Sequence, residues 1–187
     1  MSEQSILVER AVVFATAAHA AVGQTRKYGG EPYINHPLEV MDILRRYASW
    51  PVSDEQLAAA ALHDVVEDTR VTIELIRETF GDVVASLVDD LTDVSRPEDG
   101  NRRVRKEIDR QHTANAGPAS KSVKLADLIS NGRSIVPNDP GFARVYLREK
   151  AAILDVCHDA DPGLLAEARR TLEQGLADLS RGARIAF

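Results

Sequence analysis

A run of ionisable side chains inside an apolar, alanine-rich segment constrains this chain more than any other feature. Residues 57–62 read LAAAAL and lead directly into His63, Asp64, Glu67 and Asp68. Residues four apart share a face of a helix, so the first two side chains lie above the second two. Carboxylates this close repel one another unless a positive charge lies among them. The segment therefore predicts either an exposed acidic helix end or a site for a divalent cation.

The two interpretations assign different tasks to the same residues. An acidic run is usually a solvated face, which favours the exposed helix end. Five small or apolar residues run straight into the polar group, however, and argue against simple exposure. If a cation is held by His63 and Asp64, then Glu67 and Asp68 lie beside it and can handle protons. The run by itself leaves both interpretations open.

Bulk properties narrow the class of protein. The 187 residues fit one domain, predicted to cover residues 1–187. The net charge of −6 argues against a nucleic-acid binder, which is normally basic. The single Cys157 excludes an intramolecular disulfide and a cysteine-rich zinc site. Because there is neither a signal-peptide pattern nor an apolar stretch long enough for a membrane helix, we expect a soluble, cytoplasmic protein.

Hydrophobic periodicity predicts the fold class. Apolar residues recur at helical spacing through most of the chain, and aromatic residues make up only 5% of it. We therefore predict an all-α, single-domain helical bundle of roughly seven to nine helices. The helices are expected at 5–21, 38–47, 54–67, 73–80, 83–94, 121–135, 142–157 and 162–179. Loops are expected at 23–37, 95–101 and 136–141, where Gly and Pro interrupt the pattern.

Two more segments offer metal ligands. His36 lies in a loop directly before a proline, which favours an extended backbone there. Asp127 lies among apolar residues, where a buried carboxylate needs a basic partner or a metal. Together with His63 and Asp64 they make two imidazoles and two carboxylates, a set that suits Mn²⁺, Fe²⁺ or Zn²⁺. Such an ion activates water near neutral pH and neutralises a phosphoryl oxygen, so the set predicts a metal-dependent phosphohydrolase.

Basic residues indicate where a polyphosphate would bind. The loop 23–37 carries Arg26 and Lys27 beside two tyrosines, which suits a phosphate together with a base or sugar. An ordinary solvated loop is the simpler interpretation of that loop alone. The densest basic group is Arg102, Arg103, Arg105 and Lys106. A solvated helical face is the more common interpretation of such a group.

Three sequence blocks resemble one family. RKYGGEPYINHP at 26–37, ALHDVVEDT at 61–69 and VKLADLISN at 123–131 are similar to blocks of the hydrolase domain of RelA/SpoT homologues. That domain belongs to the HD phosphohydrolase superfamily, and the chain looks most similar to the stand-alone small alarmone hydrolases. The C-terminal residues match only in being helical. The resemblance implies an HD-type helical fold and hydrolysis of the 3′-pyrophosphate of (p)ppGpp, the stringent-response alarmone, to GDP or GTP plus pyrophosphate.

The resemblance also implies residue roles by position. The ligands of one Mn²⁺ per chain, with Fe²⁺ or Zn²⁺ as alternatives, would be His36, His63, Asp64 and Asp127. Glu67 and Asp68 match the pair that activates the attacking water. The implied substrate contacts are Arg26, Lys27, Asn131, Arg102, Arg103 and Lys106.

Two positions depart from the family pattern. Leu128 stands where the family has a basic residue, and Ser130 stands where it has an aromatic residue or His. Both changes remove groups beside the nucleotide, so a ppApp-type alarmone or NADPH remains an alternative substrate. A non-catalytic nucleotide sensor is a third hypothesis, against which the retained Glu67 and Asp68 argue. The expected partner is a small nucleotide, without nucleic acid or membrane, and the sequence leaves the oligomeric state open.

Overall fold

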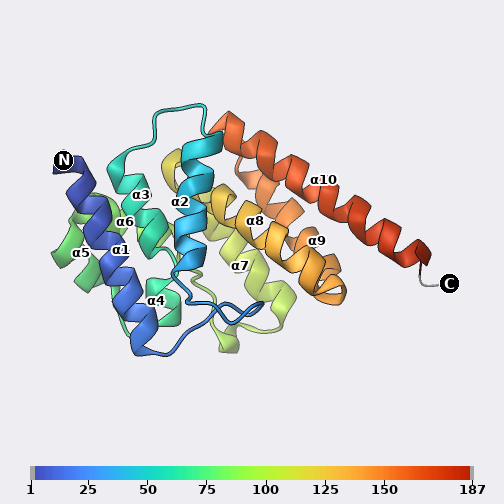
Figure 1. The fold of residues 1–187 in the computed structure, drawn as a ribbon, viewed down its shortest axis with the longest axis horizontal. Coiled ribbons are helices and arrows are strands. Elements are labelled where there is room, and N and C mark those ends of the chain that lie inside the picture. The colour runs from blue at the N-terminus through green and yellow to red at the C-terminus, as the bar shows by residue number, and fades with distance from the viewer. Residues whose placement is uncertain (1–2, 186–187) are drawn as a thin grey trace.

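The described residues form an all-helical fold, which confirms the predicted fold class (Figure 1). The computed structural model describes the backbone of residues 3–185 and the side chains of residues 6–181. Its elements are α1 (Glu3–Ala21), α2 (Asn35–Tyr47), α3 (Asp54–Leu62), α4 (Val65–Asp68), α5 (Ile73–Phe80), α6 (Asp82–Leu91), the 3-10 turn η1 (Pro97–Asp99), α7 (Arg102–Asn115), α8 (Pro118–Asn138), α9 (Pro140–Val156) and α10 (Pro162–Ile185). No helix among these residues is both long and apolar enough to cross a membrane.

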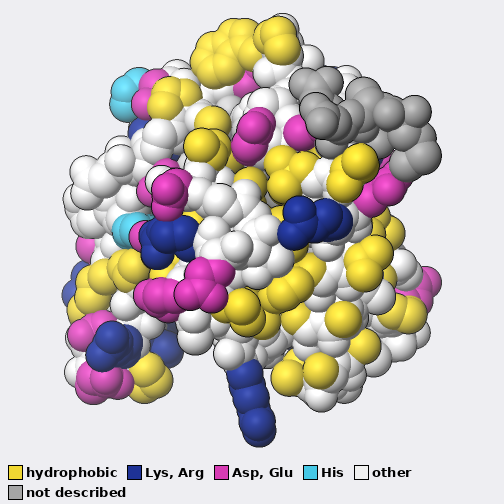
Figure 2. Space-filling model, turned by 90° about the vertical axis from the view of Figure 1, so that its left-hand side faces the viewer, with side chains coloured by type: hydrophobic (Ala, Val, Ile, Leu, Met, Phe, Trp, Pro, Cys, Tyr) yellow, Lys and Arg dark blue, Asp and Glu magenta, His cyan; other side chains and the backbone are white. Residues whose placement is uncertain are grey.

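Helix α8 is the axis of the fold. It packs against α2, α3, α6, α9 and α10, whereas α1 packs on the outer side of α3. In Figure 1, α1, α5 and α6 lie at one end of the long axis and α10 extends toward the other. Figure 2 looks onto the α1, α5 and α6 end, where apolar side chains are interspersed with charged ones. That mixture is normal for a protein surface.

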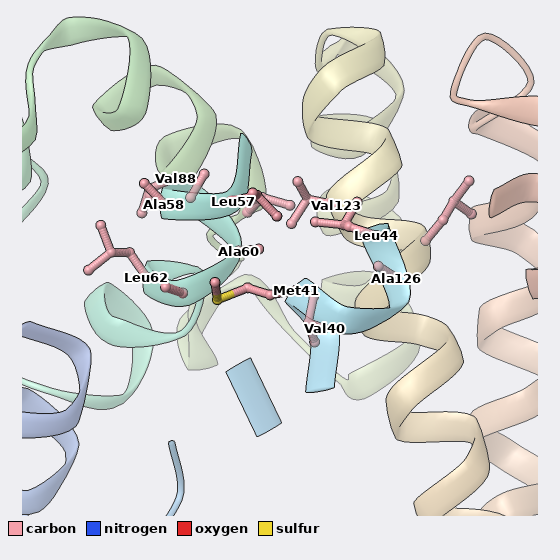
Figure 3. Packing of buried hydrophobic residues seen from close by; sticks show 14 of the residues in the cluster. Val40, Met41, Leu44, Leu57, Ala58, Ala60, Leu62, Val88, Val123 and Ala126 are labelled. Carbon is pink, nitrogen blue, oxygen red and sulfur yellow. The ribbon is translucent and has the colours of Figure 1, made fainter. Parts of the chain in front are cut away.

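The alanine-rich segment is the centre of the core. Ala58, Ala59, Ala60 and Ala61 have no exposed surface, so α3 is buried on all sides over these residues. Small side chains allow neighbouring helices to approach closely. Figure 3 shows side chains from α2, α3, α6 and α8 pointing toward one another, among them Val40, Met41, Leu44, Leu57, Leu62, Val88, Val123 and Ala126. This packing fixes the C-terminal end of α3, where the ionisable run begins.

The single helix predicted over 54–67 is wrong, because it breaks at the ionisable run. Helix α3 ends at Leu62, and α4 begins at Val65. Asp64 has φ −98° and ψ −4°, outside regular helical values. Adjacent residues of a regular helix do not face each other. The break therefore lets both His63 and Asp64 face the same site, which an unbroken helix would prevent.

Two predicted loops are shorter than expected. His36 lies in the first turn of α2 instead of in an extended loop, and its N–H donates to the carbonyl of Tyr33 at 2.9 Å. Helix α8 continues through Pro137, which reduces the predicted loop 136–141 to Asp139. The side chain of Asp139 caps α9 by accepting from the N–H of Phe142 at 3.1 Å. A proline is tolerated here because only the last turn of α8 remains to be completed.

Candidate functional site

The fold brings the four predicted ligand residues together from α2, the α3–α4 turn and α8. His36 Nε2 lies 3.1 Å from Asp127 Oδ1 and 3.6 Å from Asp64 Oδ2. His63 Nε2 lies 3.0 Å from Asp64 Oδ2 and 3.8 Å from Asp127 Oδ1. The ligand atoms of His36, His63 and Asp64 all lie within 4.8 Å of one another, which makes these three residues a candidate metal site.

The environment of His36 fixes which ring nitrogen faces this site. The hydroxyl of Ser130 donates to Glu39 Oε2 at 2.8 Å, so its oxygen remains free to accept. His36 Nδ1 lies 3.0 Å from that oxygen and is therefore the protonated nitrogen. The lone pair of Nε2 then points at the two carboxylates, as metal-binding histidines require. Ser130, the position that departs from the family pattern, thus orients His36.

His63 is oriented in the same way by the backbone. Its Nδ1 lies 2.8 Å from the carbonyl oxygen of Ala60, which can only accept, so Nδ1 carries the proton. His63 Nε2 is buried and has no hydrogen-bond partner among the described residues. A buried ring nitrogen beside two carboxylates has to carry a proton or meet a cation. Both imidazoles therefore fit a cation on the side of Asp64.

The charges of the cluster also call for a cation. Burial raises the pKa of Asp64, but His63 and His36 outweigh it and hold that pKa well below its usual range. Burial is likewise outweighed at Asp127, mainly by His36, and its pKa is lowered to about 2. Burial lowers the pKa of His63, yet Asp64 and Asp127 raise it to about 9 overall. Both carboxylates thus remain ionised, and a divalent ion would replace the proton on His63.

Glu67 and Asp68 lie beside the cluster, each with one oxygen already engaged. Glu67 Oε1 accepts from the N–H of Asp93 at 2.5 Å. Burial and the neighbouring Asp93 raise the pKa of Glu67 to about 7. Asp68 Oδ2 accepts from Gln24 Nε2 at 2.7 Å, and Gln24 Oε1 is held in turn by His19 Nδ1 at 2.7 Å. Each carboxylate therefore has one oxygen left for proton transfer.

Two further polar residues contact the carboxylates of the cluster. The hydroxyl of Tyr33 donates to Asp64 Oδ2 at 2.6 Å, and its ring lies against His19 with 4.6 Å between centroids. Asn131 Nδ2 donates to Asp127 Oδ1 at 2.5 Å. Asn131, predicted as a substrate contact, thus also positions Asp127. Tyr33 acts on Asp64, a role that the sequence did not suggest.

A cavity of about 740 Å³ opens beside the cluster. Its volume is in the range of small-molecule sites. The predicted site residues that line it are Asp64, Glu67, Asp68, Arg102, Arg103, Lys106, Asp127 and Asn131. Of the predicted basic group, Arg105 does not line the cavity. His36 and His63 lie behind the carboxylates.

Arg26 and Lys27 lie away from this cavity. The guanidinium of Arg26 is 3.8 Å from Glu39, the residue that accepts from Ser130. Lys27 Nζ is 3.2 Å from Asp139 and lies over the ring of Phe142 at 5.4 Å. Arg26 is therefore linked to His36 through Glu39 and Ser130, and Lys27 is joined to the start of α9. Their predicted contacts with a nucleotide remain predictions.

Carboxylates already neutralise part of the predicted basic group. Arg102 makes two hydrogen bonds to Glu149, at 2.7 and 2.8 Å. Lys106 Nζ lies 2.6 Å from Asp93 and 3.2 Å from Asp109. The sequence did not indicate four other cations that line the cavity, Arg110, Lys124, Arg148 and Lys150. Lys124 lies three residues from Asp127 on α8, which was the one available signal. Periodicity alone did not indicate which face of α9 would point toward the cavity.

Comparisons with known proteins agree with this geometry. The family model of the HD domain matches residues 11–136. A guanosine-3′,5′-bis(diphosphate) 3′-pyrophosphohydrolase MESH1 from Xenopus tropicalis is 37% identical over 138 residues, which is 72% of this chain and 73% of that protein. A probable GTP pyrophosphokinase from Mycobacterium leprae is 40% identical over 130 residues, which is 69% of this chain but 16% of that protein.

A solved structure extends the likeness to nearly the whole chain. The structure described as a metazoan ortholog of SpoT that hydrolyzes ppGpp superposes with a TM-score of 0.79 and 27% identity, covering 93% of this chain and 96% of that one. The chain belongs to the HD domain family. Within that family it is related to the hydrolase domains of SpoT and RelA proteins and to the stand-alone MESH1 hydrolases, as the three sequence blocks predict.

Proposed function

We propose that this protein is a metal-dependent guanosine-3′,5′-bis(diphosphate) 3′-pyrophosphohydrolase. The observation that carries the proposal is the joint orientation of the two imidazoles. His36 and His63 both direct Nε2 at Asp64, beside Glu67 and next to a cavity of about 740 Å³. The likeness to MESH1 over 73% of its length supports the choice of substrate.

The cluster would hold one divalent ion through His36, His63, Asp64 and Asp127. Nitrogen and carboxylate donors without sulfur suit Mn²⁺, with Fe²⁺ or Zn²⁺ as alternatives. When bound, the ion supplies positive charge that stabilises the negative charge developing on the phosphoryl oxygens. Tyr33 and Asn131 keep the two carboxylates in place by donating to Asp64 and Asp127.

Glu67 is the residue best suited to take a proton from the attacking water. Its Oε1 is engaged by the N–H of Asp93, which leaves Oε2 free. A base with a pKa of about 7 is matched to proton transfer near neutral pH. Asp68, fixed by Gln24 through Oδ2, would orient the same water through its other oxygen. The water oxygen bonds to the phosphorus attached to O3′, and the O3′–P bond breaks.

The substrate contacts follow from the cavity. Arg102, Arg103 and Lys106 line it on the α7 side and would face the phosphates. Asn131 lines it beside Asp127 and would lie near the sugar. Arg26 and Lys27 would contact the nucleotide only after moving from Glu39 and Asp139. The products are GDP or GTP and pyrophosphate.

One observation favours a second candidate substrate. Leu128 is 5% exposed and packs in the core, so the basic residue common in the family has no counterpart here. The hydroxyl of Ser130 is hydrogen-bonded to His36 and Glu39, so it does not contact a nucleobase. A ppApp-type alarmone or the phosphate of NADPH would then be accepted by the same chemistry.

A substrate panel tests the proposal. Purified protein loaded with Mn²⁺ is incubated with ppGpp, pppGpp, ppApp and NADPH, and released pyrophosphate and orthophosphate are measured. The proposal expects pyrophosphate from both guanosine alarmones. Turnover of ppApp or NADPH without turnover of ppGpp and pppGpp would transfer the activity to the second candidate. No turnover of any compound, together with normal nucleotide binding, would favour a nucleotide sensor.

A further inference from the structure

Lys150 on α9 places a charged group at the cavity. The proposed metal ligands and substrate contacts give this group no role. Its stem packs in a small apolar gap that is also lined by Leu128, Leu147 and Leu154. Its Nζ lies 5.0 Å from the centre of the Tyr146 ring. Long basic side chains often bury the stem and extend the charged end toward a wetter region. Lys150 lines both this gap and the 740 Å³ cavity, so its side chain lies at the boundary between them.

Lys150 has no anionic partner in the part of the chain that the structure describes. It takes part in no hydrogen bond and no ion pair there, although it is only partly exposed. Other cations at the same cavity are either paired, as Arg102 is with Glu149, or open to water, as Arg148 is. Withdrawing an ammonium group from water without a partner is costly.

A second ammonium group makes the arrangement less favourable still. Lys124 on α8 lines the same cavity, donates to the carbonyl of Leu91 at 3.2 Å and lies 3.9 Å from Asp93. Burial and the charge of Lys124 together lower the pKa of Lys150 to about 8. Burial of Lys124 is outweighed by Asp93, Asp127, Glu67 and Asp64, which compensate its charge and raise its pKa, so Lys150 is the cation of the two that lacks a carboxylate at ion-pair distance among the described residues.

We infer that Lys124 and Lys150 form an anion subsite that holds the phosphate next to the one attacked, and afterwards the released pyrophosphate. Lys124 and Asp127 lie three residues apart on one face of α8, so the subsite is one helical turn from the metal cluster. A pyrophosphate group could then contact both. The inference rests on the proposed phosphohydrolase function and names the wall that holds the pyrophosphate group as it is transferred from O3′ to water.

The test compares Lys150→Met with the parent protein, because Met keeps the stem and removes the charge. Inorganic pyrophosphate is titrated calorimetrically into Mn²⁺-loaded protein, with metal content measured before and after. We expect pyrophosphate binding about tenfold weaker or more in Lys150→Met, as for loss of a charged hydrogen-bond partner. The KM for ppGpp should rise with it, while bound metal stays the same. Lys150→Arg, which retains the charge, should restore most of the binding.

Arg144→Met is the matched control. Arg144 lies on the same helix and is exposed, but it lines a separate cavity between α8, α9 and α10. The Arg144→Met variant should bind pyrophosphate as tightly as the parent protein does. Thermal unfolding adds a second readout: without anion, Lys150→Met should unfold at a higher temperature than the parent, because an unpaired charge is gone. The rise in unfolding temperature that pyrophosphate gives the parent should be lost.

The outcomes separate this inference from the proposed function. If Lys150→Met binds pyrophosphate as tightly as the parent, the subsite is refuted, whatever the activity. Equal loss of binding in Arg144→Met would also refute it, because the effect would then be one of overall charge. If the parent protein binds pyrophosphate but hydrolyses no nucleotide, and only Lys150→Met loses that binding, the subsite stands and the proposed function fails.

Discussion

The two walls of the cavity are built on opposite principles. On the metal side, the orienting atom of each residue has a protein partner: Ser130 for His36, Ala60 for His63, Tyr33 for Asp64 and Asn131 for Asp127. On the α9 side, Lys150 brings positive charge that no carboxylate at ion-pair distance balances among the described residues. The first wall would hold a cation through side chains that hydrogen bonds fix in place, and the second would hold an anion.

The difference teaches what each wall contributes. A wall whose ligands are held in advance by hydrogen bonds can bind an ion without rearrangement and supply a fixed electrostatic environment. A wall of under-compensated cations has no such order until the substrate arrives, so it contributes affinity and placement of the phosphates. The following changes test that division, from the largest expected effect to the smallest.

Asp127→Ala should remove bound metal and with it nearly all hydrolysis. The change deletes a carboxylate of the cluster, leaves His36 Nε2 without its nearest neighbour at 3.1 Å, and frees Asn131. We expect more than about a hundredfold loss of metal affinity, above the range for outer-shell partners. Mass-spectrometric metal analysis measures it. Full metal occupancy in the variant would remove Asp127 from the ligand set.

Glu67→Gln should lower kcat by about 10²- to 10⁴-fold, the usual contribution of a positioned base. Gln keeps the shape and can still accept from the N–H of Asp93, so metal content and nucleotide binding should not change. Single-turnover hydrolysis with parallel nucleotide titration separates the two. A variant that retains parental kcat would show that another group takes the proton.

Ser130→Ala should weaken metal binding about 10- to 100-fold, as expected when a group that orients a histidine ligand is lost. Without the hydroxyl, His36 Nδ1 loses its acceptor and the ring can adopt the other tautomer. Ser134→Ala, one turn further along α8, is the control and should leave metal affinity as it is. Competition with a metal indicator measures both, and equal affinities in the two variants would contradict the role of Ser130.

Asp161 supplies a contrast outside the site, because the hydrogen bonds to this buried carboxylate come from backbone N–H groups. It accepts from the N–H groups of Ser49, Trp50, Gly163 and Leu164 at 2.7 to 3.0 Å. Burial raises its pKa, but these donors lower it below the ordinary value. We expect Asp161→Asn to lose roughly 1.5–3 kcal/mol of stability near neutral pH.

The pH dependence follows from the direction of that shift. A lowered folded-state pKa means that the stabilisation is complete above the unfolded value, about 3.9, and is lost as the pH falls through the folded value. The gap in unfolding temperature between parent and Asp161→Asn should therefore be full at pH 6 and narrow below about pH 4. A gap that stays constant down to pH 3 would show that the charge of Asp161 contributes nothing.

Local patterns predicted most of the helices, because each depends on spacing within a few residues. The capping box of Ser53 and Gln56 begins α3 where the sequence placed it. The end of that helix was mispredicted, because alanine and leucine continue a helical pattern that gives no sign of the break before Val65. The extension of α8 past Pro137 was missed for a related reason, since a proline in a last turn costs little.

The sequence by itself determined the helical fold and the donor types for a metal, because periodicity and the HDVVED run are local properties. Tertiary structure alone decided how those donors are aimed and what faces them. Ser130 meets His36 across 94 residues, and the cavity is lined by Lys150 as well as by Arg102 and Lys106. A lysine carries the same charge on every face of a helix, and only packing selects the face that turns inward.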